Sequence, residues 1–211
     1  MVMLPSSMAQ DKPTVFTIGH SNHSSERFLA LLQGARITAV ADVRSVPQSR
    51  HWPHFGRARI ERWLAGADIS YVFLGAELGG RPQDPALLRE GRPVYDLMAA
   101  TPSFQNGLDR VLTEAKRHRI ALMCAEREPL DCHRFLLVSR NLHRRGAQLC
   151  HILADGSIES HQVTEVRLLR QTGFADEPLF NELPPPPDLL DRAYDIRSGR
   201  SGRARQPAGR S

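Results

Sequence analysis

Apolar runs and amphipathic stretches alternate along the middle of the chain. Short runs rich in β-branched and aromatic residues predict buried strands at 14–20, 37–43, 69–75, 120–125 and 148–153. Apolar residues at helical spacing predict helices at 24–35, 56–67, 102–119, 131–146 and 163–173. Residues 158–162 are expected to pair back onto the fifth strand, and 76–95 to form a loop with a short helix. This alternation predicts an α/β fold: an open, mostly parallel sheet of five strands or slightly more, with helices on both faces.

The two ends of the chain differ from this pattern. Residues 1–13 are polar and contain two prolines, so they are expected to be disordered, and a single α/β domain is expected to span 14–182. Residues 183–211 begin with a run of prolines and continue with Arg, Gly and Ser, which predicts a disordered tail. The proline run 183–190 should break any helix and favour an extended segment.

Composition narrows the class of protein. The formal net charge is +5, but 183–211 holds six Arg against three Asp and so supplies +3 of it. The predicted domain is therefore only weakly basic, and its charge alone does not indicate nucleic-acid binding. No apolar run approaches the roughly 18 residues that a membrane helix needs, and the start of the chain lacks the pattern of a signal peptide. Three unpaired cysteines favour a reducing compartment. We expect a cytoplasmic protein that does not enter a membrane.

Residues with useful chemistry follow four of the predicted strands. In a parallel sheet the carboxyl ends of all strands meet at one edge, and ligands bind in the crevice there. The candidates that follow strands are His20, Ser21, Asp42, Arg44, Arg81 and Glu126. Loops are polar in any protein, so the clustering of polar residues is only modest evidence for a site, and the types of residue found there are stronger evidence.

Asp42 is the most informative of these residues. A carboxylate at the end of an apolar strand needs a cationic or hydrogen-bonding partner. Arg44, Arg50 and Arg134 are the candidates for that partner.

The predicted helix 131–146 begins with reactive residues. With Asp131 as its cap, Cys132, His133 and Arg134 would occupy the first turn, where free backbone N–H groups favour an anion. The same position would activate Cys132 as a nucleophile, with His133 or Glu126 carrying the proton. The alternative is that Cys132 packs as a small apolar side chain and Arg134 pairs with a carboxylate. For Arg134 we favour a place in the site.

The sequence does not predict a metal site. Cys124 lies inside an apolar strand and is interpreted as core. A structural zinc site would have to use ligands without paired spacing: Cys132, His133, His20 and His23. A catalytic metal held by Asp42, Glu126 and His20 is a weakly supported alternative.

Other familiar motifs fail on spacing. The cysteine-phosphatase loop needs an arginine six positions after its cysteine, where Leu130 follows Cys124. No glycine-rich phosphate loop appears, so the sequence does not support a nucleotide cofactor, and the identity of any cofactor stays unknown. The loop 42–57 carries Trp52 and Phe55 among arginines. We interpret it as a lid that brings Arg50 to the cleft, with base stacking as the alternative.

Four separated motifs occur in order: "TIGHSN" (17–22), "ADVRSVPQSR" (41–50), "LGAELGGRP" (74–82) and "LMCAEREPLDCHR" (122–134). Together they resemble the domain of unknown function 488 family, over about 14–173. The resemblance implies an α/β fold with a shared polar cleft and brings no established reaction.

Three functions agree with these residues. The first is an enzyme, a hydrolase or transferase, acting on an anionic, phosphate-containing substrate such as a nucleotide or nucleic acid. In it Arg44, Arg50, Arg81 and Arg134, with His20 and Ser21, would bind the substrate, and Asp42, Glu126, Cys132 and His133 would be catalytic. The second is a non-catalytic module that binds a nucleotide or nucleic acid. The third is a regulatory or interaction protein in which the ion pairs are structural.

Overall fold

A six-stranded sheet forms the centre of the molecule. The computed structural model describes residues 12–174 and 186–199. Its strands are β1 (Thr14–Gly19), β2 (Ala39–Asp42), β3 (Ser70–Phe73), β6 (Ile120–Cys124), β7 (Gln148–Ile152) and β8 (Ile158–Ser160). Their order in the sheet is β3-β2-β6-β1-β7-β8, and all pair in parallel except β8, which runs antiparallel to β7. The predicted α/β class, the mostly parallel sheet and the final hairpin strand are confirmed.

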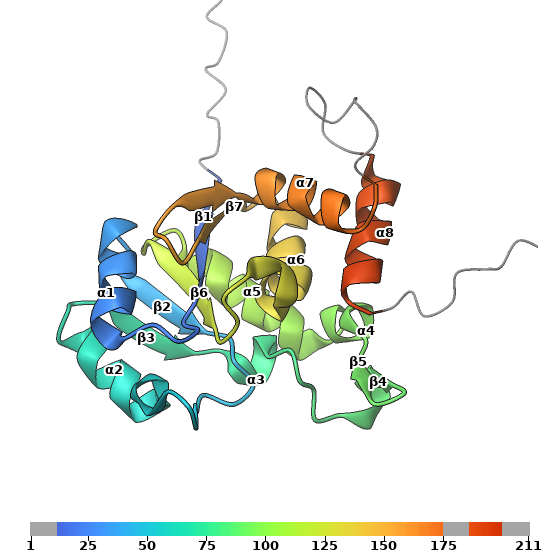
Figure 1. Cartoon of the computed structure of the whole chain (residues 1–211). Coiled ribbons are helices and arrows are strands. Elements are labelled where there is room, and N and C mark those ends of the chain that lie inside the picture. The colour runs from blue at the N-terminus through green and yellow to red at the C-terminus, as the bar shows by residue number, and fades with distance from the viewer. Residues whose placement is uncertain (1–11, 175–185, 200–211) are drawn as a thin grey trace, which may run out of the picture.

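Helices cover both faces of the sheet (Figure 1). On one face lie α1 (Ser25–Gly34) and α2 (Arg57–Ala65), which bury Phe28, Ile60 and Leu64 against the sheet. On the other lie α3 (Gly75–Leu78), α4 (Tyr95–Ala99), α5 (Pro102–Glu114) and α6 (Arg140–Arg144). The segment 76–95 also contains a small hairpin, β4 (Leu88–Arg89) with β5 (Arg92–Pro93), which the sequence did not predict. Its turn residues Glu90 and Gly91 both have positive φ, as a tight two-residue hairpin requires.

The crossover connections reverse direction between β1 and β6. The connection from β1 to β2 contains α1 and runs along one face of the sheet. The connection from β6 to β7 contains α6 and runs along the opposite face in the opposite direction. Two neighbouring strands whose connections leave in opposite directions open a crevice at their carboxyl ends. The fold therefore places a natural binding position between the ends of β1 and β6.

The predicted helix 131–146 forms differently. Pro129–Asp131 is a short 3₁₀ turn capped by the Glu128 side chain, and Cys132 is extended with φ −129°. A π-helical segment, Arg134–Ser139, then leads into α6. Asp131 therefore does not cap a helix as expected, and its carboxylate pairs with the guanidinium of Arg197.

A helix also occupies part of the predicted disordered tail. The helix α8 (Pro187–Arg197) begins at the last proline of the run, with Pro186 as N-cap and Pro187 at the first helical position, where its missing N–H group costs nothing. Ala193 and Tyr194 are buried against α7 (His161–Gln171) and the π-helical segment. The prediction that 183–190 excludes a helix was wrong, because prolines that break a helix internally are well placed at its start. Residues 1–11, 175–185 and 200–211 lie outside the described part of the chain.

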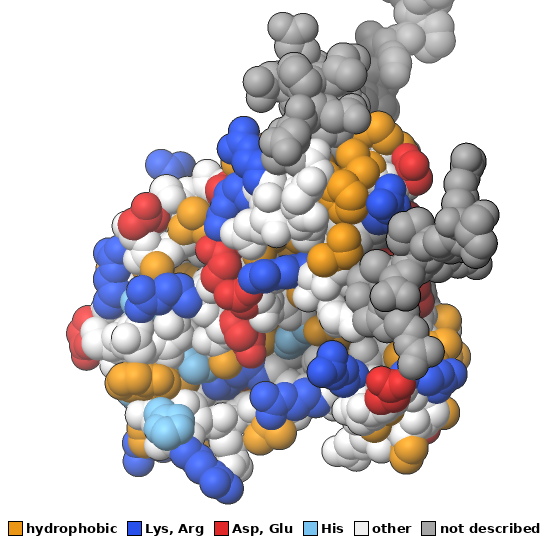
Figure 2. Space-filling model, turned by 45° about the vertical axis from the view of Figure 1, so that its right-hand side comes forward, with side chains coloured by type: hydrophobic (Ala, Val, Ile, Leu, Met, Phe, Trp, Pro, Cys, Tyr) orange, Lys and Arg blue, Asp and Glu red, His pale blue; other side chains and the backbone are white. Residues whose placement is uncertain are grey.

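Arginines on the surface lie among acidic side chains (Figure 2). Arg167 pairs with Glu128 at 2.8 Å and with Glu159 at 2.7 Å, and Arg144 pairs with Asp191 at 2.7 Å. Arg144 and Asp191 are about half exposed, and a pair as exposed as this contributes little stability. In the described part of the chain, no helix is both long and apolar enough to cross a bilayer.

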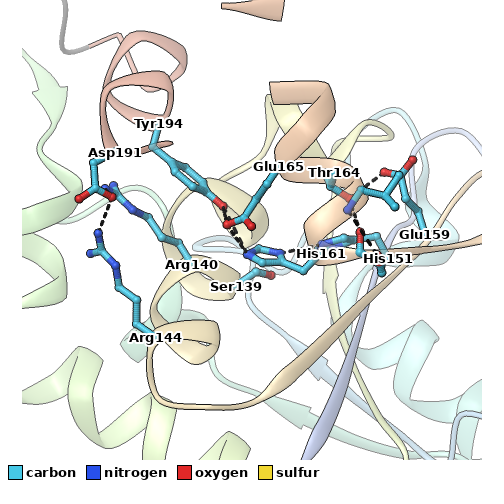
Figure 3. Close-up of polar contacts among 12 residues, drawn as sticks. Ser139, Arg140, Arg144, His151, Glu159, His161, Thr164, Glu165, Asp191 and Tyr194 are labelled. Carbon is cyan, nitrogen blue, oxygen red and sulfur yellow. Dashed lines mark hydrogen bonds and ion pairs between the residues drawn. The ribbon is translucent and has the colours of Figure 1, made fainter. Parts of the chain in front are cut away.

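A buried chain of hydrogen bonds connects the sheet to α7 and α8 (Figure 3). Glu165 accepts from Tyr194 Oη at 3.1 Å and lies 3.3 Å from His161 Nε2. His161 Nδ1 is 3.1 Å from His151 Nε2, and His151 Nδ1 is 2.8 Å from Thr17 Oγ1. If each imidazole carries one proton, every contact in the chain has one donor and one acceptor. Burial, followed by the charge of neighbouring His161, holds the pKa of His151 well below its ordinary value, and burial also lowers the pKa of His161.

We predict that the free energy of unfolding falls as the pH drops below about 6.5, the ordinary histidine pKa. The unfolded chain then binds protons that His151 and His161 in the folded chain refuse, so each contributes up to about 1.4 kcal/mol per pH unit. Urea denaturation between pH 7.5 and 4.5 measures the slope. The variant His151→Asn should show a shallower slope than the wild type, and the exposed control His51→Gln should not. Equal slopes in all three proteins would contradict the neutral histidine chain.

Candidate functional site

A polar cavity lies at the carboxyl ends of β1, β2 and β6. Its volume is about 400 Å³, which is within the range of small-molecule sites. Five of the predicted site residues line it: His20, Arg44, Arg81, Glu126 and His133. Ser45, Gln48, Ser49, Gly80, Tyr95, Cys124 and Asp131 complete most of the wall. The cavity is therefore at the crevice that the reversed crossovers create.

Gly19 allows β1 and the loop after β6 to approach closely. His20 and Ser21 continue the parallel pairing beyond the strand, with His20 N donating to Cys124 O at 2.8 Å and Ser21 N to Ala125 O at 2.9 Å. A Cβ atom at Gly19 would lie 1.9 Å from Glu126 O, which no real side chain tolerates. The glycine of "TIGHSN" thus sets the spacing between two walls of the cavity.

Asp42 and Arg44 form a buried ion pair with two parallel contacts. Arg44 Nε donates to Asp42 Oδ1 at 2.9 Å and Nη2 donates to Oδ2 at 2.6 Å. Asp42 also accepts from Arg44 N at 3.1 Å and from Tyr71 Oη at 2.8 Å. Of the predicted cationic partners, Arg44 is the one that Asp42 contacts. With both oxygens occupied in this way, Asp42 positions Arg44 and is poorly placed for proton transfer to a substrate.

Arg44 fixes the state of His20. Arg44 Nη1 donates to His20 Nε2 at 3.2 Å, and His20 Nδ1 donates to Ser21 O at 3.0 Å. Both contacts are satisfied only by a neutral imidazole protonated on Nδ1. Burial, and then the charge of Arg44, lower the pKa of His20 to about 4. A metal held by Asp42, Glu126 and His20 is not favoured, since Asp42 and His20 are both committed to Arg44.

Cys124, Glu126, Cys132 and His133 converge at the bottom of the cavity, and we call them the cysteine cluster. Cys124 Sγ lies 2.8 Å and Cys132 Sγ 3.0 Å from the same oxygen, Glu126 Oε2. His133 Nδ1 lies 3.5 Å from Cys124 Sγ and 3.9 Å from Cys132 Sγ. The ligand atoms of all four side chains are within 4.8 Å of one another. Two thiols, a carboxylate and an imidazole thus meet around one point.

The two cysteines have opposite proton affinities. Burial alone raises the pKa of Cys132, but the hydrogen bond from Cys124 and the charges of Arg134 and His133 outweigh it and hold the pKa well below its usual value. Burial and the hydrogen bond with Cys132 raise the pKa of Cys124 well above it. Burial lowers the pKa of His133, but contact with Cys132 more than compensates and leaves it raised. Cys132 and His133 therefore favour a thiolate beside an imidazolium.

The remaining predicted site residues lie away from the cavity wall. The fully buried Arg134 donates from Nη1 to Glu126 O at 2.6 Å and from Nη2 to Arg127 O at 3.0 Å, so it holds the loop after β6. Ser21 accepts a hydrogen bond from Arg127 Nε at 3.2 Å. Arg50 is exposed and is not among the residues that line the cavity. Cys132 is buried behind Glu126.

Comparison with protein families covers three of the four motifs, those at 41–50, 74–82 and 122–134. Residues 24–141, more than half of the chain, match the model of the domain of unknown function DUF488. The chain belongs to this family. Curated proteins and solved structures give no match to the chain.

Cys124 is the site residue that the sequence interpretation of this DUF488 protein missed. It was interpreted as core because it ends an apolar strand, and its side chain does share a face with Ile120 and Leu122. The signal that could have found it is its place as the last strand residue, since Cys124 lies at the edge where Glu126 and Cys132 return. Gly80 is a second missed residue: a Cβ there would lie 2.5 Å from His133 Cγ, so this glycine makes room for the imidazole.

We predict that Asp42→Asn destabilises the DUF488 domain strongly. Removal of one charge from the buried pair leaves Arg44 uncompensated, at a cost of about 3–5 kcal/mol. Urea denaturation at neutral pH measures the loss. The matched control is Asp68→Asn, an exposed turn residue, which should change stability by less than about 0.5 kcal/mol. Similar losses in the two variants would show that the Asp42–Arg44 pair does not hold the site together.

Proposed function

We propose that this protein is an enzyme, a hydrolase or transferase, that acts on a small anionic, phosphate-containing substrate in the cavity between β1, β2 and β6. The observation that carries the proposal is the meeting of two kinds of group in one chamber. Arg44 and Arg81 line it as cations, and Glu126, His133 and Cys124 line it as groups able to exchange protons or form bonds. Substrate binding and chemistry therefore have residues within the same small volume.

Arg81 is the main anion-binding residue in this proposal. Its side chain is exposed at the cavity wall, and its backbone N–H is held by Ser45 Oγ at 2.9 Å. The contacts of Arg44 with Asp42, His20 and Phe55 O use four of its guanidinium N–H groups, which leaves at most one of five for a ligand. Arg81 supplies the fork that phosphate favours, and Arg44 adds one directed donor.

In this proposal Glu126 and His133 face the substrate from the cavity wall, with His133 packed beside Gly80. Both line the cavity, and both are oriented by the protein: Glu126 Oε2 by the two cysteines and His133 by the carbonyl of Val43. Such fixed groups suit general acid–base catalysis. Cys132 acts on the substrate only through Glu126, because it does not reach the cavity wall.

A non-catalytic nucleotide-binding module is the second candidate. Trp52 is 39% exposed and belongs to the loop whose Ser45, Gln48 and Ser49 line the cavity. An exposed indole in this loop favours a ligand with a base to stack on it. Acidic side chains lie among the basic ones in Figure 2, which favours a single nucleotide over a long nucleic acid.

We predict that phosphate-containing ligands raise the melting temperature of the wild type and raise it much less in Arg81→Gln. A panel of inorganic phosphate, nucleotides and phosphosugars in thermal-shift experiments finds the class of ligand. The control is Arg117→Gln, an exposed arginine next to the amino end of β6, which should respond like the wild type. The same response in all three proteins would show that Arg81 and this cavity do not bind the ligand.

Turnover then separates the two candidates. If the protein is an enzyme, Glu126→Gln should still bind the selected ligand, while its rate of conversion falls by about 100-fold or more, as expected when a general acid–base group is lost. Binding without conversion in the wild type would favour the nucleotide-binding module.

A further inference from the structure

The cysteine cluster has the composition of a metal site. It presents two thiols, one imidazole nitrogen and one carboxylate, which are the three kinds of ligand that zinc takes in proteins. We propose that Cys124, Cys132, His133 and Glu126 bind one Zn²⁺ ion at the bottom of the cavity. The inference deepens the proposed function and rests on the same cavity, but metal binding is measured without a substrate, so either proposal can fail alone.

The distances between the ligand atoms suit a tetrahedral ion. With ordinary zinc bond lengths, a sulfur and a nitrogen on one tetrahedral ion lie about 3.6 Å apart. His133 Nδ1 lies 3.5 Å from Cys124 Sγ and 3.9 Å from Cys132 Sγ, close to that value. Glu126 Oε2 is nearer to the sulfurs, at 2.8 and 3.0 Å, so the carboxylate must withdraw by about 0.7 Å to reach the tetrahedral separation of about 3.6 Å. A side chain on a loop at the cavity wall has room for this movement.

His133 is oriented as a ligand through Nδ1. Its Nε2 is 2.9 Å from the carbonyl oxygen of Val43, which can only accept, so Nε2 carries the proton. When Nδ1 gives up its proton to solvent on metal binding, the neutral ring presents the lone pair of this atom to the two sulfurs. Zinc-binding histidines in general donate their other N–H to a carbonyl or carboxylate in this way. Gly80 permits this orientation of the His133 ring, because any side chain at position 80 would collide with the ring.

Charge supplies a second argument. Cys124, Cys132 and Glu126 each become anionic on losing a proton, and the two buried sulfurs both lie within 3.0 Å of the same carboxylate oxygen. Three anions so close together repel one another unless a cation lies between them. The backbone N–H of Arg134 donates to Cys132 Sγ at 3.4 Å, and its guanidinium lies on the carbonyls of the same loop. A divalent ion with three anionic ligands would leave one negative charge, which the buried Arg134 offsets.

The position of the cluster gives the ion a function. Cys124, Glu126 and His133 line the cavity, while Cys132 closes the cluster from behind. An ion held there is reached from the cavity on one side only. If Glu126 withdraws from the ion, that side opens to a phosphate oxygen or a water molecule, as in catalytic zinc sites with three protein ligands. The proposed substrate and the ion would then meet above His133.

The test uses the full chain, purified with reductant and without chelator. Elemental analysis should find one zinc per chain, and titration of metal-free protein with Co²⁺ should give the strong near-ultraviolet absorption of thiolate bound to cobalt. Cys132→Ala and Cys124→Ala should weaken Zn²⁺ binding by about 100-fold or more, since loss even of groups that only support ligands costs 10–100-fold. The matched control is Cys150→Ser, whose cysteine lies on β7 outside the cluster, and it should bind like the wild type.

Two results would overturn the proposal. One is wild-type protein that shows no thiolate absorption with Co²⁺. The other is a loss of zinc in Cys150→Ser as large as that in Cys132→Ala. If Cys132→Ala does not fold, the wild-type absorption and the variant Glu126→Gln still decide the matter, because Glu126→Gln should keep the thiolate absorption and shift the weaker visible bands of cobalt. An unchanged visible spectrum would remove Glu126 from the ligands. Loss of phosphate binding with the cobalt spectrum intact would count against the proposed function alone.

Discussion

The buried pair of Asp42 and Arg44 is the contact on which the cavity depends. It joins β2 to β3 through Tyr71, to β1 through His20, and to the following loop through the carbonyl of Phe55. His20 in turn stacks on the Phe55 ring, with centroids 4.3 Å apart. A buried charge is costly unless its donors and acceptors are matched. Here both oxygens of Asp42 and four of the five guanidinium N–H groups of Arg44 have partners, which come from four segments. The Asp42–Arg44 pair thus fixes the positions of the segments that form this side of the cavity.

The fold could be predicted from the sequence because its strands and helices have strong, separate periods. Buried strands such as 37–43 and amphipathic helices such as 24–35 leave little choice of class. The strand order could not be predicted, since parallel pairing of β1 with β6 joins residues about a hundred positions apart. The π-helical segment and the helix α8 were not predicted for a different reason. The contacts that stabilise them come from other elements of the fold, and the local sequence does not show those contacts.

The candidate site was predicted in its location and less well in its roles. Sorting residues by strand end placed His20, Arg44, Arg81 and Glu126 on one cavity, because that rule depends only on parallel strands. Side-chain partners are decided in three dimensions. Arg134 bonds to backbone carbonyls rather than facing the cavity, and Cys124 joins a cluster that spacing along the chain does not reveal. Residue types indicated the chemistry, and only the packing shows which atoms meet.

The central place of β1 bears on what can be regarded as one domain. The family match begins at residue 24 and ends at 141, but β1 lies before it and β7 after it. Those strands are neighbours in the sheet, and β1 also forms the pairing that brings His20 to the cavity. A fragment cut at the limits of the match would leave β6 as a bare hydrophobic edge, open to pairing with other chains. The segment of this chain that matches the family is therefore smaller than the sheet that carries the cavity.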